Sequence, residues 1–294
     1  MKRNDIIRLL STLPLLTSMN PLHSLYQLSE NMNKTARMPV LFLGHGNPMN
    51  AIEENQFVQG FRTVAKNIPS PSAILCISAH WYIAGTKVTA MEHPKTIHDF
   101  GGFPKALYEV EYPAPGSPSL AQTTKDLLAP TSVELDDSWG LDHGAWTVIK
   151  HLYPEANIPV IQMSIDYTKP ASYHYELAQK LNSLRDKGIL IIGSGNIIHN
   201  LGLVDFQQID KVGYGYDWAI EAHTRINSLL LKGDYQSLID YKKESNAIQL
   251  AIPTPDHYLP LIYTLALHDK KESISLFNDE LLAGSLSMTS IKIG

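Results

Sequence analysis

Short, continuous runs of apolar residues recur along the chain after residue 38. They are rich in β-branched side chains and have no polar alternation, which is typical of strands buried on both faces of a sheet. Because both faces of such strands are covered, the pattern predicts a mostly parallel sheet. The runs are PVLFL (39–43), AILCIS (73–78), IPVIQMSI (158–165) and ILIIG (189–193).

Amphipathic stretches separate these runs. Their apolar residues recur at helical spacing, and the last stretch ends at Gly188, as helices often do. Alternating strands and helices favour a sheet with helices on both faces. The predicted helices cover residues 55–68, 119–129, 144–153 and 172–188.

The C-terminal part of the chain contains three more predicted helices and a different kind of strand. The helices span about 214–231, 235–246 and 258–268, with Gly233 as the break between the first two. The tail segments SISLF and GSLSMTSIKI alternate with period two. This alternation predicts an antiparallel pair at the edge of the sheet.

These elements together predict an α/β protein. We expect a single three-layer domain over residues 38–294, with a mostly parallel central sheet, helices on both faces and an antiparallel edge. No internal repeat or low-complexity linker divides this range.

Residues 1–37 differ from the rest and form an N-terminal leader of uncertain role, either a degenerate signal peptide or a disordered segment. A basic start precedes a short apolar stretch, which Arg8 interrupts and Pro14 breaks. We therefore expect a cytoplasmic protein, with export as the alternative if the leader is a functional signal. Elsewhere no run approaches the ~20 apolar residues of a membrane span.

Composition narrows the class of partner. The net charge of -5 is spread without basic blocks, so the cationic face that nucleic acids require is not expected. The single cysteine, Cys76, lies within an apolar run, which excludes a disulfide framework and indicates a small buried hydrophobe. We expect a monomer or a small homo-oligomer.

Five of the twelve histidines follow a strand end or lie in a turn rich in Gly, Pro or Asp. Ligands of open α/β sheets gather at the carboxyl ends of the strands, and imidazole nitrogen binds zinc, iron(II), copper and nickel. The pattern favours an open metal site, although it also fits five loop histidines, some of which cap helices. The five are His45 (GHGNP), His80 (SAHW), His143 (GLDHGAW), His199 (GNIIHN) and His257 (TPDHYLP).

Other chemistries have less support. The GSGN segment at residues 193–196 lacks the full dinucleotide-binding pattern, and no G-x-S-x-G nucleophile motif occurs. The glycines on both sides of His45 are expected to let backbone and substrate approach that histidine closely.

Several motifs together resemble the class III extradiol ring-cleavage dioxygenases, in particular the bacterial and plant 4,5-DOPA extradiol dioxygenase branch. The likeness covers about residues 38–294 in order and spacing. The motifs that carry it are LFLGHGNPMNAIE, ILCISAHWY, HDFGGFPKALYEVEYPAPG, SWGLDHGAWTVIKHLYPEANIPVIQMSID, GSGNIIHNL and IPTPDHYLPLIY.

The resemblance implies one divalent metal, non-haem Fe(II) or Zn(II), near the carboxyl edge of the sheet. By analogy the metal ligands are His45, His80 and His257. His199 is then a fourth ligand or a base beside the metal, and His143 is the other acid/base histidine. Better known relatives use two histidines and a carboxylate, whereas the last ligand position here is a histidine, which makes zinc a realistic occupant.

The implied activity is extradiol cleavage of a catechol such as DOPA, with O2 as the second substrate. A flat ring calls for an aromatic pocket, for which Trp81, Phe100 and Phe103 are candidates. Core packing is the alternative for Phe103. Two other functions remain open: a zinc-dependent hydrolase that uses the same histidines, and a non-catalytic binding protein on the same fold.

Overall fold

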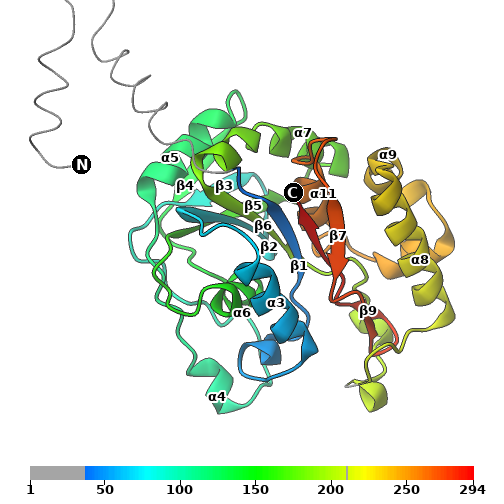
Figure 1. Cartoon of the computed structure of the whole chain (residues 1–294). Helices are drawn as coiled ribbons and strands as arrows, with labels where there is room; N and C mark the ends of the chain where they lie inside the picture. Colours follow the sequence, from blue (N-terminus) through cyan, green and yellow to red (C-terminus); the bar gives the residue numbers. More distant parts are fainter. Residues whose placement is uncertain (1–36, 210) are drawn as a thin grey trace, which may run out of the picture. The chain divides into compact units, whose positions relative to one another are not determined.

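The computed structural model describes residues 37–209 and 211–294 (Figure 1). An eight-stranded sheet forms their centre, in the order β4-β3-β5-β2-β6-β1-β10-β7, and β8 and β9 form a separate antiparallel pair. The strands are β1 (Val40–Gly44), β2 (Ala73–Ile83), β3 (Thr86–Thr89), β4 (Val133–Asp136), β5 (Val160–Asp166), β6 (Ile189–Gly195), β7 (Ile274–Phe277), β8 (Leu281–Leu282), β9 (Leu286–Ser287) and β10 (Ser290–Ile293).

The four central strands confirm the predicted parallel sheet. β5, β2, β6 and β1 are neighbours and run parallel, with Leu75 opposite Ile191 and Val40 opposite the same residue on its other side. The predicted antiparallel edge is also confirmed, because β10 pairs with β1 and β7 pairs with β10. In Figure 1 these red C-terminal strands lie beside the blue β1.

The other edge of the sheet was not predicted. There β3 pairs antiparallel with β5 and parallel with β4. Both strands are only four residues long, and β4 exposes Glu134 and Leu135. Such short segments lack the continuous apolar run that marked the central strands.

Helices cover both faces of the sheet, which confirms the three-layer prediction. Side chains of β1 alternate between two separate cores: Val40 and Phe42 pack on one face, and Leu41 and Leu43 on the other. The second face is covered by α3 (Gln56–Lys66) and α6 (His143–Leu152). The first is covered by α5 (Pro118–Leu127), α7 (Ala171–Gln179), α8 (Asp217–Lys232), α9 (Tyr235–Ile239), α10 (Asn246–Ala251) and α11 (Leu259–Leu265).

Short helices complete the described chain and correct two predictions. The helix predicted for 172–188 ends at Gln179 and continues as a 3-10 helix up to Gly188, which adopts a left-handed φ of 76°. The helix predicted for 235–246 is likewise divided at Asp240. The short elements are α4 (Lys105–Tyr108) and the 3-10 helices η1 (Pro48–Ala51), η2 (Asn182–Lys187), η3 (Leu201–Leu203), η4 (Phe206–Gln208) and η5 (Tyr241–Lys243).

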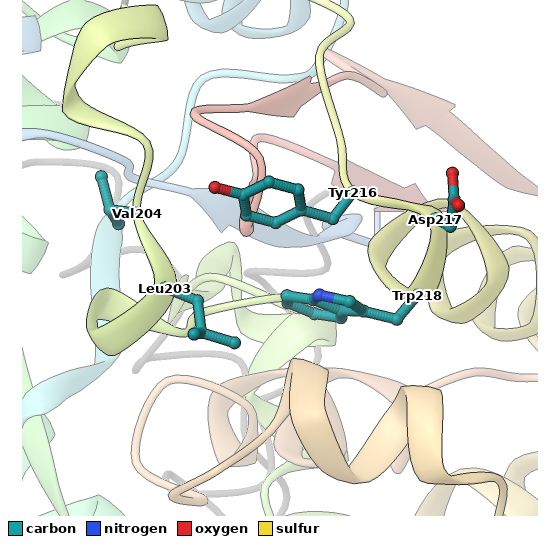
Figure 2. Close-up of a pocket in the computed structure, with 5 residues that line it drawn as sticks. All are labelled: Leu203, Val204, Tyr216, Asp217 and Trp218. Carbon is teal, nitrogen blue, oxygen red and sulfur yellow. The ribbon is translucent and has the colours of Figure 1, made fainter.

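A surface hollow of about 550 Å³ lies along the segment between β6 and α8 (Figure 2). The rings of Tyr216 and Trp218 lie 6.2 Å apart at its wall. None of the five candidate histidines lines this hollow. Its lining residues are Leu203, Val204, Tyr216, Asp217 and Trp218.

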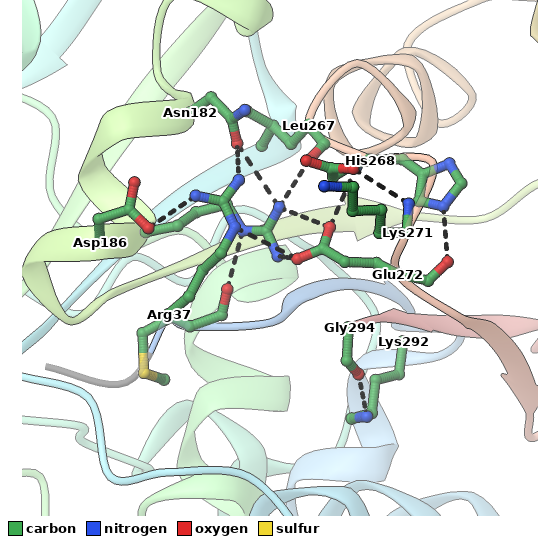
Figure 3. A network of polar contacts seen from close by, with 12 residues as sticks. Arg37, Asn182, Asp186, Leu267, His268, Lys271, Glu272, Lys292 and Gly294 are labelled. Atoms are coloured by element: carbon green, nitrogen blue, oxygen red, sulfur yellow. Dashed lines mark hydrogen bonds and ion pairs between the residues drawn. The ribbon is translucent and has the colours of Figure 1, made fainter.

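A buried arginine fixes the start of β1, the strand that leads to His45. Arg185 is fully buried and donates hydrogen bonds to the backbone oxygens of Met38 and Leu267, at 2.8 and 2.6 Å. It also forms an ion pair with Glu272, which Arg37 contacts at 3.3 Å (Figure 3). Arg37 therefore packs on the domain predicted for residues 38–294, whereas the rest of the predicted leader, residues 1–36, lies outside the described residues.

None of the helices in the described part of the chain has the length and apolar character needed to cross a membrane.

Candidate metal centre

Five histidines from separate parts of the sequence meet at the carboxyl edge of the central sheet. His45 follows β1, and its backbone N–H continues the pairing with β6 by donating to Gly195 O at 3.0 Å. His80 lies within β2, where the pairing register with β5 shifts, rather than beyond the strand as predicted. His143 begins α6, and His199 and His257 follow β6 and precede α11, respectively.

Three of these histidines form a compact group. The ring centroids of His45, His80 and His257 lie 4.9 to 5.2 Å from one another. One ring nitrogen of each lies within 4.8 Å of the other two, and the Nε2 atoms of His45 and His80 are 3.3 Å apart. Such a spacing lets three imidazoles share one ion.

Hydrogen bonding assigns the tautomer of His45. Its Nδ1 lies 3.0 Å from Ser194 Oγ, and that hydroxyl donates its own proton to Gly144 O. The hydroxyl therefore accepts from His45, which places the ring proton on Nδ1. The Nε2 lone pair of His45 is left facing the other histidines.

Carboxylates lie beside the other two rings. Nδ1 of His257 is hydrogen-bonded to Asp256 Oδ2, and Nδ1 of His80 lies at the longer distance of 3.5 Å from Asp99 Oδ2. Each carboxylate favours a proton on Nδ1, so Nε2 carries the lone pair. Burial raises the pKa of Asp256, but its contacts, first among them the hydrogen bond with His257, together lower it by more. The pKa of Asp256 therefore lies well below its ordinary value, and the carboxylate is ionised.

The three rings fit a divalent cation. Burial lowers the pKa of His45 and of His80, and the neighbouring histidines lower both further, so the rings are neutral at neutral pH. Ring nitrogens of the three histidines converge within 4.8 Å of one another. A cation is the group that would satisfy these nitrogens, and His45, His80 and His257 are its candidate ligands.

His143 is presented by the first turn of α6, a buried and well-capped helix start. Asp142 is the N-cap and accepts from Ala145 N at 3.0 Å, from Ser78 Oγ at 2.6 Å and from Gln162 Nε2 at 2.6 Å. The ring of His143 lies 3.8 Å from that of His80. Its place beside the compact group is therefore fixed by α6 and not by a mobile loop.

The ring of His199 stacks on that of His257. His199 belongs to a second possible metal-binding group, with Asp256 and His257, and not to the group that contains His45 and His80. Its backbone N–H donates to Ala251 O at 2.9 Å. Burial lowers its pKa to about 3, and the neighbouring His257 contributes. His199 is thus a neutral imidazole beside the three candidate ligands.

Comparison with known proteins assigns the family. Residues 34–284 match the family model of the catalytic LigB subunit of aromatic ring-opening dioxygenase. The chain belongs to the LigB family. The fold and the motifs that resembled class III extradiol dioxygenases are thereby confirmed, and so are the enzyme class and the requirement for a metal, a small-molecule substrate and O2.

Relatives and a solved structure agree with this family. The chain is 47% identical to "4,5-DOPA dioxygenase extradiol" of Escherichia coli K12, over 88% of this chain and 96% of the relative. It is 37% identical to the protein of that name in Beta vulgaris, over 85% and 94%. The crystal structure of an uncharacterized protein of Escherichia coli K12 has a TM-score of 0.75 and 42% identity, covering 88% of this chain and all of that one.

The aromatic residues predicted for the LigB-family pocket lie in two places. The ring of Phe100 lies 5.5 Å from that of His143 and 5.4 Å from that of Phe103. Trp81 is buried and stacks on Trp139 at 5.5 Å. Its role in substrate binding stays a prediction.

The glycines beside His45 serve the backbone rather than an incoming substrate. A side chain on Gly44 would meet the backbone oxygen of Met288 at 2.6 Å, and one on Gly46 would meet the side chain of the same methionine. The backbone that closely approaches the two glycines is therefore the segment between β9 and β10, which contains Met288. The position of His45 is fixed by this packing.

Two residues of the site were missed by sequence reasoning. Asp99 lies in the HDFGG motif, where only aromatic residues had been singled out, and Ser194 lies in the GSGN segment. Ser194 stands between two glycines at the end of β6, which is a signal that could have been used, whereas Asp99 lies in the long loop between β3 and α4 and carries no such signal. Nothing in the sequence states which histidine each one contacts.

Proposed function

We propose that this LigB-family enzyme is an extradiol dioxygenase that cleaves the ring of a DOPA-like catechol with iron(II) as its metal. The observation that carries the proposal is the convergence of ring nitrogens of His45, His80 and His257 within 4.8 Å of one another, with a hydroxyl or carboxylate oxygen beside Nδ1 of each ring. The names of the bacterial and plant relatives support the substrate class.

His45, His80 and His257 would hold iron(II), which would supply a redox-active centre for a catechol and O2 that redox-inert zinc cannot supply. Phe100 and Phe103 form the aromatic side of the pocket, where a flat ring can pack against them.

His199 and His143 are the proton-transfer groups in this proposal. His199 is a neutral imidazole and accepts the proton of a catechol hydroxyl as the substrate binds. His143 lies on another side of the group, with its ring 5.8 Å from that of His45 and 3.8 Å from that of His80. It donates a proton that helps ring opening.

Metal loading followed by oxygen uptake tests the function. The protein is loaded anaerobically with iron(II) or zinc, and oxygen consumption and the yellow absorbance of a ring-opened semialdehyde are recorded with DOPA, caffeate and protocatechuate. We expect uptake with iron(II) only, with DOPA the best substrate. His45→Ala should abolish uptake, and substitution of the exposed His93 by alanine should not.

Two results would contradict this function. Absence of oxygen uptake with every metal and every catechol would remove the dioxygenase activity. Metal-dependent hydrolysis of an ester or amide under anaerobic conditions would support the zinc hydrolase instead.

A further inference from the structure

The carboxylate of Asp99 lies between two histidines that have different roles in the site. Its Oδ2 is 3.5 Å from Nδ1 of His80, a candidate metal ligand. Its Oδ1 is 3.0 Å from Nδ1 of His143, a candidate proton donor, and accepts the backbone N–H of His143 at 2.8 Å. One carboxylate thus reaches both groups.

The segment that carries Asp99 is held firmly against the start of α6. Ile97 N–H donates to Leu141 O at 2.7 Å, and Leu141 N–H donates to Lys95 O at 2.9 Å. The indole N–H of Trp146 donates to Ile97 O at 2.9 Å. These hydrogen bonds tie residues 95 and 97, just before Asp99, to Leu141 and Trp146, which flank His143. The carboxylate of Asp99 therefore has a fixed position relative to His143.

The carboxylate is largely buried. Its side chain is 18% exposed. Asp142 is the other acidic group nearby, and its carboxylate accepts hydrogen bonds from the side chains of Ser78 and Gln162.

We propose that Asp99 is a positioning residue that holds His80 in its metal-binding tautomer and His143 in its orientation toward the substrate. The proposal rests on the function proposed above and adds a residue to it. With Oδ2 as acceptor, the proton of His80 stays on Nδ1 and its Nε2 faces His45 and His257. With Oδ1 beside His143, that ring is kept against His80.

A simpler role for Asp99 is to supplement the N-cap Asp142 by accepting the backbone N–H of His143 at the start of α6. Substitution by asparagine separates the two roles. The amide oxygen of Asn can still accept that N–H, whereas its NH2 group would face the N–H of His80, donor against donor. A pure cap would tolerate the change, since Asn is as good a capping residue as Asp.

The experiment compares Asp99→Asn with wild type and with Asp234→Asn. Asp234 also caps a helix, accepting Ser237 N–H at 3.2 Å at the start of α9, so it is a matched control. Metal affinity is measured by competition with a chromophoric chelator, and the absorption spectrum of the Co(II)-loaded protein reports the ligand set. Oxygen uptake with DOPA on iron(II)-loaded protein gives kcat and KM.

For Asp99→Asn we expect about 10- to 100-fold weaker metal binding, an altered Co(II) spectrum and a lower kcat with little change in KM. Asp234→Asn should behave as wild type. Asp99→Ser is the second variant, because its side chain is one bond shorter than that of aspartate and does not reach His80. It should show the same losses if Asp99→Asn does not fold.

Wild-type metal affinity, spectrum and kcat in the substituted proteins would overturn the role of Asp99 while leaving the proposed function intact. Two metal ions per wild-type chain and one per Asp99→Asn chain would also overturn it, because Asp99 would then be a ligand. A wild-type protein that binds metal but never consumes oxygen would remove the proposed function, and the claim for His143 with it.

Discussion

The rings of His199 and His257 are stacked, with their centroids 3.6 Å apart and their planes 11° from parallel. This arrangement places the face of His199, rather than a ring nitrogen, against a candidate ligand. His199→Ala is therefore expected to lower kcat by roughly 100-fold or more and to leave the metal content within about twofold of wild type. Metal analysis and oxygen uptake on the same samples check it. Loss of metal equal to that of His45→Ala would make His199 a ligand.

Asp256 is expected to set the metal affinity through His257, because its carboxylate contacts Nδ1 of that ring. Asp256→Asn should weaken metal binding by about 10- to 100-fold. Chelator competition measures the change. The exposed Asp126, which pairs with Gln122 on α5, is the control, and its asparagine variant should retain full affinity. Equal affinities of the two variants would contradict the role of Asp256.

Phe100 and Trp81 are expected to differ in substrate binding. Phe100→Ala should raise KM for the catechol by roughly 10-fold, which corresponds to about 1.4 kcal/mol of aromatic contact. Trp81→Phe should leave KM near wild type and lower the free energy of unfolding by about 1 kcal/mol, because the stack on Trp139 is reduced. Steady-state kinetics and urea unfolding separate the effects. A raised KM in Trp81→Phe would instead support its predicted contact with substrate.

Gly44 is expected to be intolerant of a side chain. In Gly44→Ala the new Cβ would meet the backbone oxygen of Met288 at 2.6 Å, and neither backbone can move without disturbing the β1 pairing. We expect a loss of about 2 kcal/mol in the free energy of unfolding. Gly101→Ala is the control, since no atom lies within 4 Å of its Cβ position. Similar unfolding curves for both variants would argue against this packing.

His174 is expected to make the protein less stable in acid. The ring is fully buried and bonded to Tyr263, and burial lowers its pKa from 6.5 to about 4. Between these two values the unfolded chain binds the proton and the folded chain does not. The contribution of His174 to the free energy of unfolding is therefore complete above pH 6.5. It falls as the pH drops toward 4 and is constant below that pH.

The contribution of His174 should amount to about 2 kcal/mol between pH 7.5 and pH 5. His174→Gln removes this titration, so its free energy of unfolding should depend less steeply on pH than that of wild type by this amount. Urea unfolding at the two pH values measures both. His93→Gln, on an exposed histidine, should keep the wild-type slope. If the free energy of unfolding depended equally on pH in His174→Gln and in wild type, the proposed contribution of His174 would be wrong.

The sequence by itself determined the central layers of this protein. Runs such as 189–193 are apolar at every position, and only a strand covered on both faces can bury all of them. It also determined that histidines follow β1 and β6, because strand ends and glycines are visible along the chain. The division of α7 from η2 was beyond it, since helical spacing continues through a segment that the buried Arg185 holds in a tighter turn.

Only the tertiary structure decided which acceptor holds which ring. Ser194 contacts His45 across 149 positions of the chain, and Asp99 reaches His143 across 44. Local patterns carry no record of such pairs, because a hydrogen bond depends on the packing of whole elements and not on neighbours in sequence. The kinds of residues at the site could therefore be predicted from the sequence. The tautomer of each histidine, and so the nitrogen that it offers to a metal, depends on the contacts made in the folded protein.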